Sequence, residues 1–315
     1  MTPPSIPSAT RSFFRIPTVA ALVGFGALVS ACGATTTSRP VATATPVNGQ
    51  HVSGTSGYGS DGGKPSATTT LAHAATREFA AEVQSSAAAF VTSVIALQTD
   101  AARGDLATAR SDELAAQGHY DAIRALESGN SVNASTLDEL ETDLLPGQSF
   151  GGLHAIERDL WATGPLATDM AALAGQAPVA QFLLSREHLG PEAIGIVAVD
   201  QLSWVAGTAL PSSQEHTSHL GLIDVVATEQ AAERAFRIIE PLAHAVDPVR
   251  TAAVSDQFAT LSVDVAALGP PATTPDTSVA PAARLSVTRQ LDATATTLAR
   301  LVAELAPYGT TGAPS

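Results

Sequence analysis

The sequence is poor in cysteine, lysine and aromatic residues. It contains one cysteine, Cys32, and one lysine, Lys64, and aromatic side chains make up only 4% of its residues. A single cysteine excludes a framework of intramolecular disulfides. Hydrophobic residues nevertheless make up 45% of the chain, with alanine at most of the small positions. This composition predicts helices that pack closely through small side chains.

Positive charge is also scarce. The chain has 16 lysines and arginines against 30 aspartates and glutamates, which gives a net charge of −14. Binding to a phosphate backbone needs a basic surface, so we expect no nucleic acid partner. An acidic surface instead attracts cations.

The N-terminus has the pattern of an export signal. Arg11 and Arg15 precede an apolar run over residues 16–31, which is shorter than the about 20 residues of a membrane-spanning helix. The run ends in Val-Ser-Ala-Cys at Cys32, which resembles the lipobox of bacterial lipoproteins. We expect residues 1–31 to be a lipoprotein signal peptide and Cys32 to carry the lipid. The alternative is an ordinary secretory signal followed by an unmodified cysteine.

Three stretches of different composition follow this signal. Residues 32–70 are rich in Thr, Ser, Gly and Pro, which predicts a disordered tether. Residues 71–306 form the helical domain, and residues 307–315 form a loose tail. A lipid on Cys32 would hold the domain at the extracytoplasmic face of the bacterial cell membrane.

Apolar residues recur at intervals of three and four throughout the domain, which is the helical period. Turn signals such as Gly104-Asp105, Gly190-Pro191 and Asp247-Pro248 separate the periodic stretches. The predicted helices cover residues 77–103, 106–127, 152–162, 165–187, 191–209, 219–243, 248–267 and 281–305. Alternating strand patterns are scarce, so the sequence predicts an all-α helical bundle. The domain is long enough for two four-helix-bundle-like halves.

The segment GGLHAIERDLW, residues 151–161, differs from the other predicted helices. His154 and Glu157 are three residues apart, so they project from one helical face. An imidazole and a carboxylate at the edge of a core are costly unless a partner satisfies them. A metal ion is one such partner. The alternative is a hydrogen bond between His154 and Glu157, without a metal. Gly151 and Gly152 would allow the preceding loop to approach the helix closely.

Three segments together resemble the imelysin-like family. The stretch GLHAIERDLW resembles the family's GxHxxE motif and the leucine–aromatic run after it. Upstream, GHYDAIRALE resembles the family's tyrosine–acidic–x–isoleucine segment and contains Asp121. Downstream, QEHTSHLGLIDVV resembles an acidic–serine–histidine segment and contains His219 and Asp224. The segments follow the family's order within residues 77–305.

This resemblance implies an all-α fold of two bundle-like halves with a metal site near their junction. It implies His154 and Glu157 as metal ligands, with Asp121, His219 and Asp224 as completing ligands or their neighbours. The implied cargo is iron, with zinc and manganese as alternatives. The implied role is that of the short form of EfeO/EfeM-type iron-uptake components, without a cupredoxin domain, passing metal to an iron permease in the membrane.

Four positions depart from the family pattern. Arg124 stands where a second acidic residue is usual, and Thr217 replaces a tyrosine. Gly221 replaces a common aspartate, and Thr228 stands near a usual asparagine. Fewer acidic ligands imply weaker binding, another metal or a site that is no longer used.

Two other functions remain open at this stage. One is an imelysin-type metallopeptidase, which needs an open metal position and a general base. The sequence contains no HExxH motif and offers no separate base, so we favour a protein without enzymatic activity. The other is a non-catalytic helical scaffold lipoprotein with a relict metal site.

Overall fold

The computed structural model describes residues 66–127, 136–141, 144, 150–162, 166–186, 189–211 and 217–308. These residues are mostly helical, and they contain no strand. The predicted all-α fold is therefore confirmed. Cys32, the signal peptide, most of the tether and residues 309–315 lie outside the described residues.

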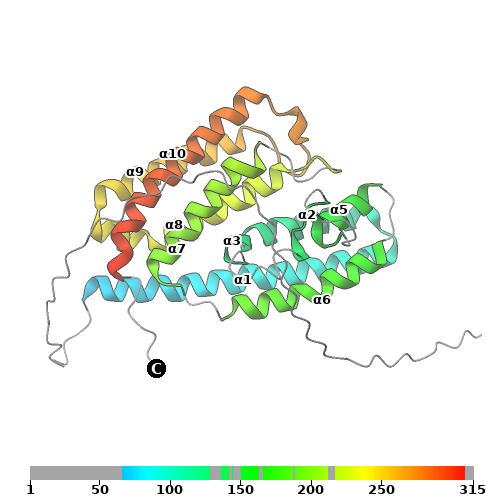
Figure 1. Cartoon of the computed structure of the whole chain (residues 1–315), viewed down its shortest axis with the longest axis horizontal. Helices are drawn as coiled ribbons and strands as arrows, with labels where there is room; N and C mark the ends of the chain where they lie inside the picture. The colour runs from blue at the N-terminus through cyan, green and yellow to red at the C-terminus, as the bar shows by residue number, and fades with distance from the viewer. Residues whose placement is uncertain are drawn as a thin grey trace, which may run out of the picture. The chain divides into compact units, whose positions relative to one another are not determined.

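The longest helix, α1 (Ala67–Arg103), forms the base on which both halves of the domain pack (Figure 1). It begins at Ser66, whose hydroxyl accepts a hydrogen bond from Thr69 N at 3.1 Å. Its start lies within the range expected to be tether, so the predicted boundary at residue 70 is four residues too late. The helix is long and apolar enough to cross a membrane by length and composition alone. Its buried residues, however, recur every three or four positions from Ala72 to Leu97, which is typical of a bundle helix.

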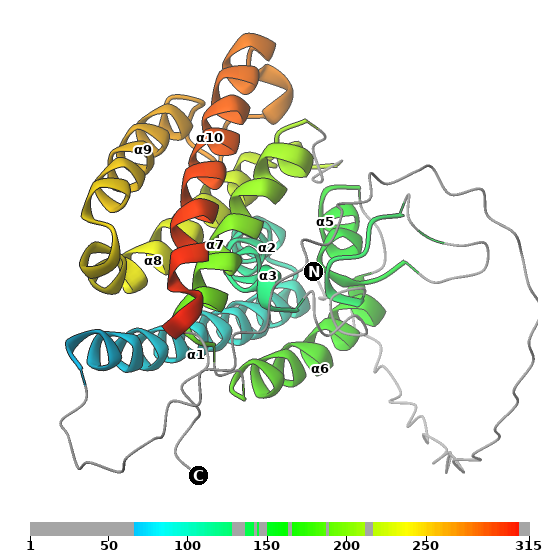
Figure 2. The same cartoon turned by 60° about the vertical axis from the view of Figure 1, so that its left-hand side comes forward.

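The described helices form two groups (Figures 1 and 2). Beside α1, the first group contains α2 (Leu106–Asp121), α5 (Gly152–Ala162) and α6 (Leu166–Leu184). The second contains α7 (Pro191–Trp204), α8 (Leu222–Val246), α9 (Pro248–Ala266) and α10 (Pro281–Leu305). We call them the N-terminal half and the C-terminal half. The first turns of α8 also contact α2, so the two halves meet there.

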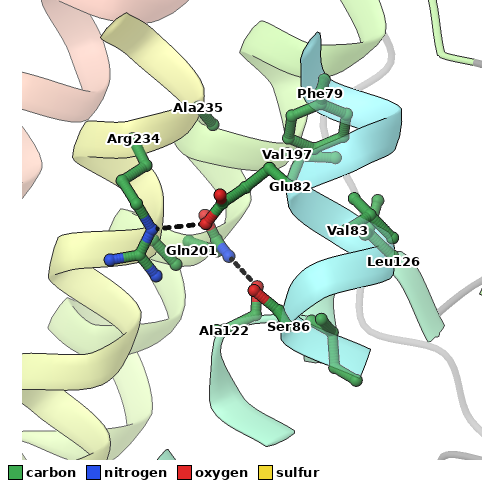
Figure 3. A pocket seen from close by; sticks show the side chains of 12 residues that line it. Phe79, Glu82, Val83, Ser86, Ala122, Leu126, Val197, Gln201, Arg234 and Ala235 are labelled. Atoms are coloured by element: carbon green, nitrogen blue, oxygen red, sulfur yellow. Dashed lines mark hydrogen bonds and ion pairs between the residues drawn. The ribbon is translucent and has the colours of Figure 1, made fainter. Parts of the chain in front are cut away.

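The predicted helix over residues 106–127 is broken in the structure. It divides into α2 and a short helix, α3 (Arg124–Glu127), with a turn at Ala122 and Ile123. Gln201 Nε2, on α7, donates a hydrogen bond to the Ala122 carbonyl oxygen at 3.2 Å (Figure 3). This bond occupies a carbonyl at the break, and its donor lies 79 residues away in the sequence. The local pattern of the predicted helix could not reveal it.

The helices around α7 and α8 also have boundaries that differ from the prediction. The predicted helix 191–209 ends as α7 at Trp204 and continues as a π-helical turn, Val205–Ala209. The predicted helix 219–243 begins at Leu222, because His219 has a positive φ of 59°, which a right-handed helix does not contain. The His219 carbonyl oxygen instead accepts a hydrogen bond from Asp276 N at 2.8 Å.

Candidate metal centre

The HxxE residues lie inside the N-terminal half. His154 and Glu157 are both on α5, as predicted, and their exposed fractions are 3% and 2%. Their neighbours Leu153 and Ile156 are fully buried. Because both polar side chains are enclosed, their hydrogen-bonding groups must be satisfied within the protein.

His154 contacts an aspartate that the sequence analysis did not identify. The distance from His154 Nε2 to Asp138 Oδ1 is 3.1 Å. The backbone beside Asp138 lies against the start of α5, because a Cβ on Gly152 would come within 2.5 Å of the Leu137 carbonyl oxygen. Gly152 also has a φ of 79°, so glycine is required here on both grounds. The expected close approach thus exists, and it involves Gly152 rather than Gly151, which has open space around it.

Arg124 joins Asp138 to Asp121. Its Nη1 lies 3.6 Å from Asp138 Oδ2, and its Nε lies 3.8 Å from Asp121 Oδ1. The guanidinium also stacks on Trp204 of α7, 3.1 Å from the ring centroid. Where the resemblance suggests another acid, this chain therefore places a cation between two carboxylates.

Asp121 has a further partner on its own helix. Gln117 Nε2 donates to Asp121 Oδ1 at 3.2 Å, and Asp121 is 1% exposed. Glu113, Gln117 and Asp121 are spaced by four residues, so they form a buried polar stripe along α2. The i, i+4, i+8 spacing was visible in the sequence and could have identified Glu113.

Glu157 holds the segment that leads into α8. Its Oε1 accepts hydrogen bonds from the backbone nitrogens of Thr217, at 3.0 Å, and Ser218, at 2.5 Å. Since Thr217 contributes its backbone to this contact, the change from the family's tyrosine does not affect it. The bonds to Glu157 also fix the position of His219, one residue further on.

The two remaining predicted residues differ in their placement. The His219 side chain is exposed, so it is not part of the buried set. Asp224, in the first turn of α8, is 1% exposed. Gly118 brings α2 against this turn, because a Cβ there would lie 3.6 Å from Ile223. The structure thus gathers Asp121 and Asp224 on packed helices and leaves the His219 imidazole outside.

The donor types in this region suit a metal, but their arrangement does not yet form a site. Imidazole and carboxylate are the ligands that iron, zinc and manganese take in proteins. Among the described residues, however, no three His, Cys, Asp or Glu side chains converge closely enough to hold a metal ion. In this arrangement Arg124 is the cation that faces Asp121 and Asp138.

Comparison with known proteins adds no relative. The sequence matches no family model, and no curated protein is detectably similar to it. The resemblance to the imelysin-like family therefore rests on the three short segments alone.

Proposed function

We propose that the chain is a membrane-anchored, extracytoplasmic metal-binding protein that captures iron and passes it to a membrane permease. The observation that carries this proposal is the burial of His154, Glu157, Asp121 and Asp224 on α2, α5 and α8. Removing a carboxylate from water costs several kcal/mol per ion. Hydrophobic side chains at these positions would avoid that cost, so the retention of several ionisable groups supports a ligand-binding role.

The proposed capture step exchanges one cation for another. His154 and Glu157 would hold the metal, with Asp121 and Asp224 nearby, while Arg124 gives up its contacts with Asp121 or Asp138. Arg124 keeps its stacking on Trp204, so it need not move into solvent. Binding requires neutral imidazole and ionised carboxylates, and capture therefore weakens as the pH falls.

The proposed location depends on Cys32. A lipid on this cysteine would keep the helical domain close to a permease in the same membrane. Cys32→Ala should release the protein from the membrane, which detergent-phase partitioning of cell extracts would detect. Continued partitioning into the detergent phase would contradict the anchor.

The second candidate is a scaffold lipoprotein with a relict metal site. Two observations favour it: Arg124 already supplies positive charge to the carboxylates, and the described donors do not converge. In this alternative Arg124 has replaced the metal permanently. The metal content of the purified protein separates the two proposals, because a protein with a relict site binds no metal.

The test is metal titration of the full chain, purified without a histidine tag. We expect saturable binding of Fe²⁺, measured anaerobically by calorimetry, with Zn²⁺ and Mn²⁺ as comparison ions. His154→Ala and Glu157→Gln should each weaken metal binding by about 10–100-fold or more. Loss of a residue that only supports a metal ligand already weakens binding by this amount. His244→Ala, which removes an exposed histidine of α8, is the matched control and should bind as wild type does. Absence of binding in the wild type would favour the relict site, and cleavage of a peptide library would favour the metallopeptidase.

A further inference from the structure

A groove between α8 and α9 lies within the C-terminal half, in a part of the structure that the proposed metal site does not use. These two helices form a hairpin that turns at Asp247, and the groove opens beside the loop that follows α9. Its volume is about 590 Å³, which is within the range of small-molecule sites. Part of its lining is apolar, from Val226, Val265 and Pro270.

The polar part of the groove contains a buried carboxylate, and one of its two oxygens accepts a hydrogen bond. Glu229 is 2% exposed, and its Oε1 accepts a hydrogen bond from the Ser262 hydroxyl at 2.7 Å. Its Oε2 makes no hydrogen bond to any described residue. The same Ser262 hydroxyl lies 3.4 Å from Glu233 Oε2, and Glu233 also lines the groove. Burial raises the pKa of Glu229, and the nearby Glu233 charge raises it further.

The arginine side chains nearest the groove form ion pairs outside it or at its edge. None of the described residues that line the groove is a lysine, an arginine or a histidine. Arg234, the neighbour of Glu233, pairs with Glu82 of α1 at 2.8 Å (Figure 3). Arg237 lies between Glu233 and Glu240, at 3.2 and 3.1 Å. Glu233 therefore has a partial counter-charge in direct contact. Glu229 contacts the Ser262 hydroxyl and has no arginine in direct contact among the described residues, although the charge of Arg234 acts on it from a distance.

We propose that this groove binds a small alkylammonium ion. A primary ammonium has three N–H donors, and Glu229 Oε2, Glu233 and Ser262 provide acceptors for them. Its alkyl chain would lie on Val226, Val265 and Pro270, where removal of apolar surface from water favours binding. An organic cation fits better than a bare metal ion, because two carboxylates beside an apolar wall leave most metal positions without oxygen ligands.

The test is calorimetric titration of the full chain with hexylammonium chloride. We expect one saturable site that Glu229→Gln weakens by about 10-fold or more, because the hydrogen bond from the ammonium then loses its charged acceptor. Asp256→Asn removes an equal charge from an exposed position on α9 and should bind as wild type does. Ala266→Leu, which fills the groove without changing charge, should also abolish binding.

Four comparison probes separate the contributions of charge, alkyl chain and ligand class. Hexan-1-ol lacks the charge and ethylammonium lacks most of the alkyl chain, so both should bind more weakly than hexylammonium. Equal binding of hexan-1-ol, or unchanged binding by Glu229→Gln, would overturn the proposal. Tighter binding of Ca²⁺, or of a lysine-containing peptide, would also overturn it and assign the groove to a metal or to a protein partner.

Discussion

Helices α2 and α5 in the N-terminal half and helices α9 and α10 in the C-terminal half bury different kinds of side chain. The first pair buries five carboxyl or imidazole groups, on Glu113, Asp121, His154, Glu157 and Asp159. Along all their described residues, α9 and α10 bury no charged side chain. We therefore expect α9 and α10 to contribute mainly stability, while α2 and α5 hold ligand-type side chains whose burial costs stability. The first part of α8 shares this character through the buried Asp224 and Glu229.

The largest expected effect is in the C-terminal half. Phe236 of α8 stacks on Phe258 of α9, with ring centroids 5.4 Å apart, and both rings are fully buried. Phe258→Ala should lower the free energy of unfolding by about 3–5 kcal/mol, measured by urea denaturation. Glu157→Gln, which keeps an acceptor for both backbone N–H groups, should cost only about 1 kcal/mol. Equal losses in the two variants would contradict the division of roles between α9 and α5.

Arg124 tests how the N-terminal half stays folded without metal. Arg124→Gln removes the cation between Asp121 and Asp138 and the stacking on Trp204. We expect a loss of about 2–3 kcal/mol in the free energy of unfolding, since the buried Asp121 carboxylate loses the neighbouring positive charge. Under the metal-binding proposal, Zn²⁺ should restore part of this stability. Arg103→Gln, at a more exposed pair with Asp100, is the control and should cost less than about 1 kcal/mol.

Two adjacent glycines provide a matched pair at the start of α5. Gly152→Ala combines a positive φ with a clash against the Leu137 carbonyl oxygen. It should therefore lower the free energy of unfolding by about 2 kcal/mol. Gly151→Ala meets nothing within 4 Å and should be close to neutral in thermal melts. If Gly152→Ala left the free energy of unfolding unchanged, the segment that contains Asp138 would not lie against α5 as described.

The smallest expected effect is a gain. Because burial raises the pKa of Glu229 in the folded state, ionisation of this carboxyl lowers stability above that pKa. This loss of stability disappears as the pH falls below the pKa that the Glu229 carboxyl has in the unfolded chain. Glu229→Gln should then raise the free energy of unfolding by about 1 kcal/mol near neutral pH, with the gain vanishing in acid. A gain that stays constant with pH would contradict this cause.

The sequence predicted those parts of the structure that depend on local patterns. The helices α5 and α10 have the predicted bounds, and α9 differs by one residue. The break at Ala122 was not predicted, because its hydrogen bond comes from Gln201 on α7. At the candidate site, the sequence indicated the shared face of His154 and Glu157. It could not indicate that Asp138 lies beside His154, since only tertiary packing brings these residues together.

The central claim is that the buried groups of α2, α5 and α8 are kept for a cation rather than for the fold. Thermal denaturation of the full chain with and without metal tests it most directly. At a free metal concentration 100 times the dissociation constant, binding to the native state alone adds about 2.7 kcal/mol of stability. The account predicts a higher melting temperature for the wild type and for His244→Ala with Fe²⁺ or Zn²⁺, and a clearly smaller shift for His154→Ala at the same metal concentration. No shift in the wild type, or an equal shift in His154→Ala, would contradict it.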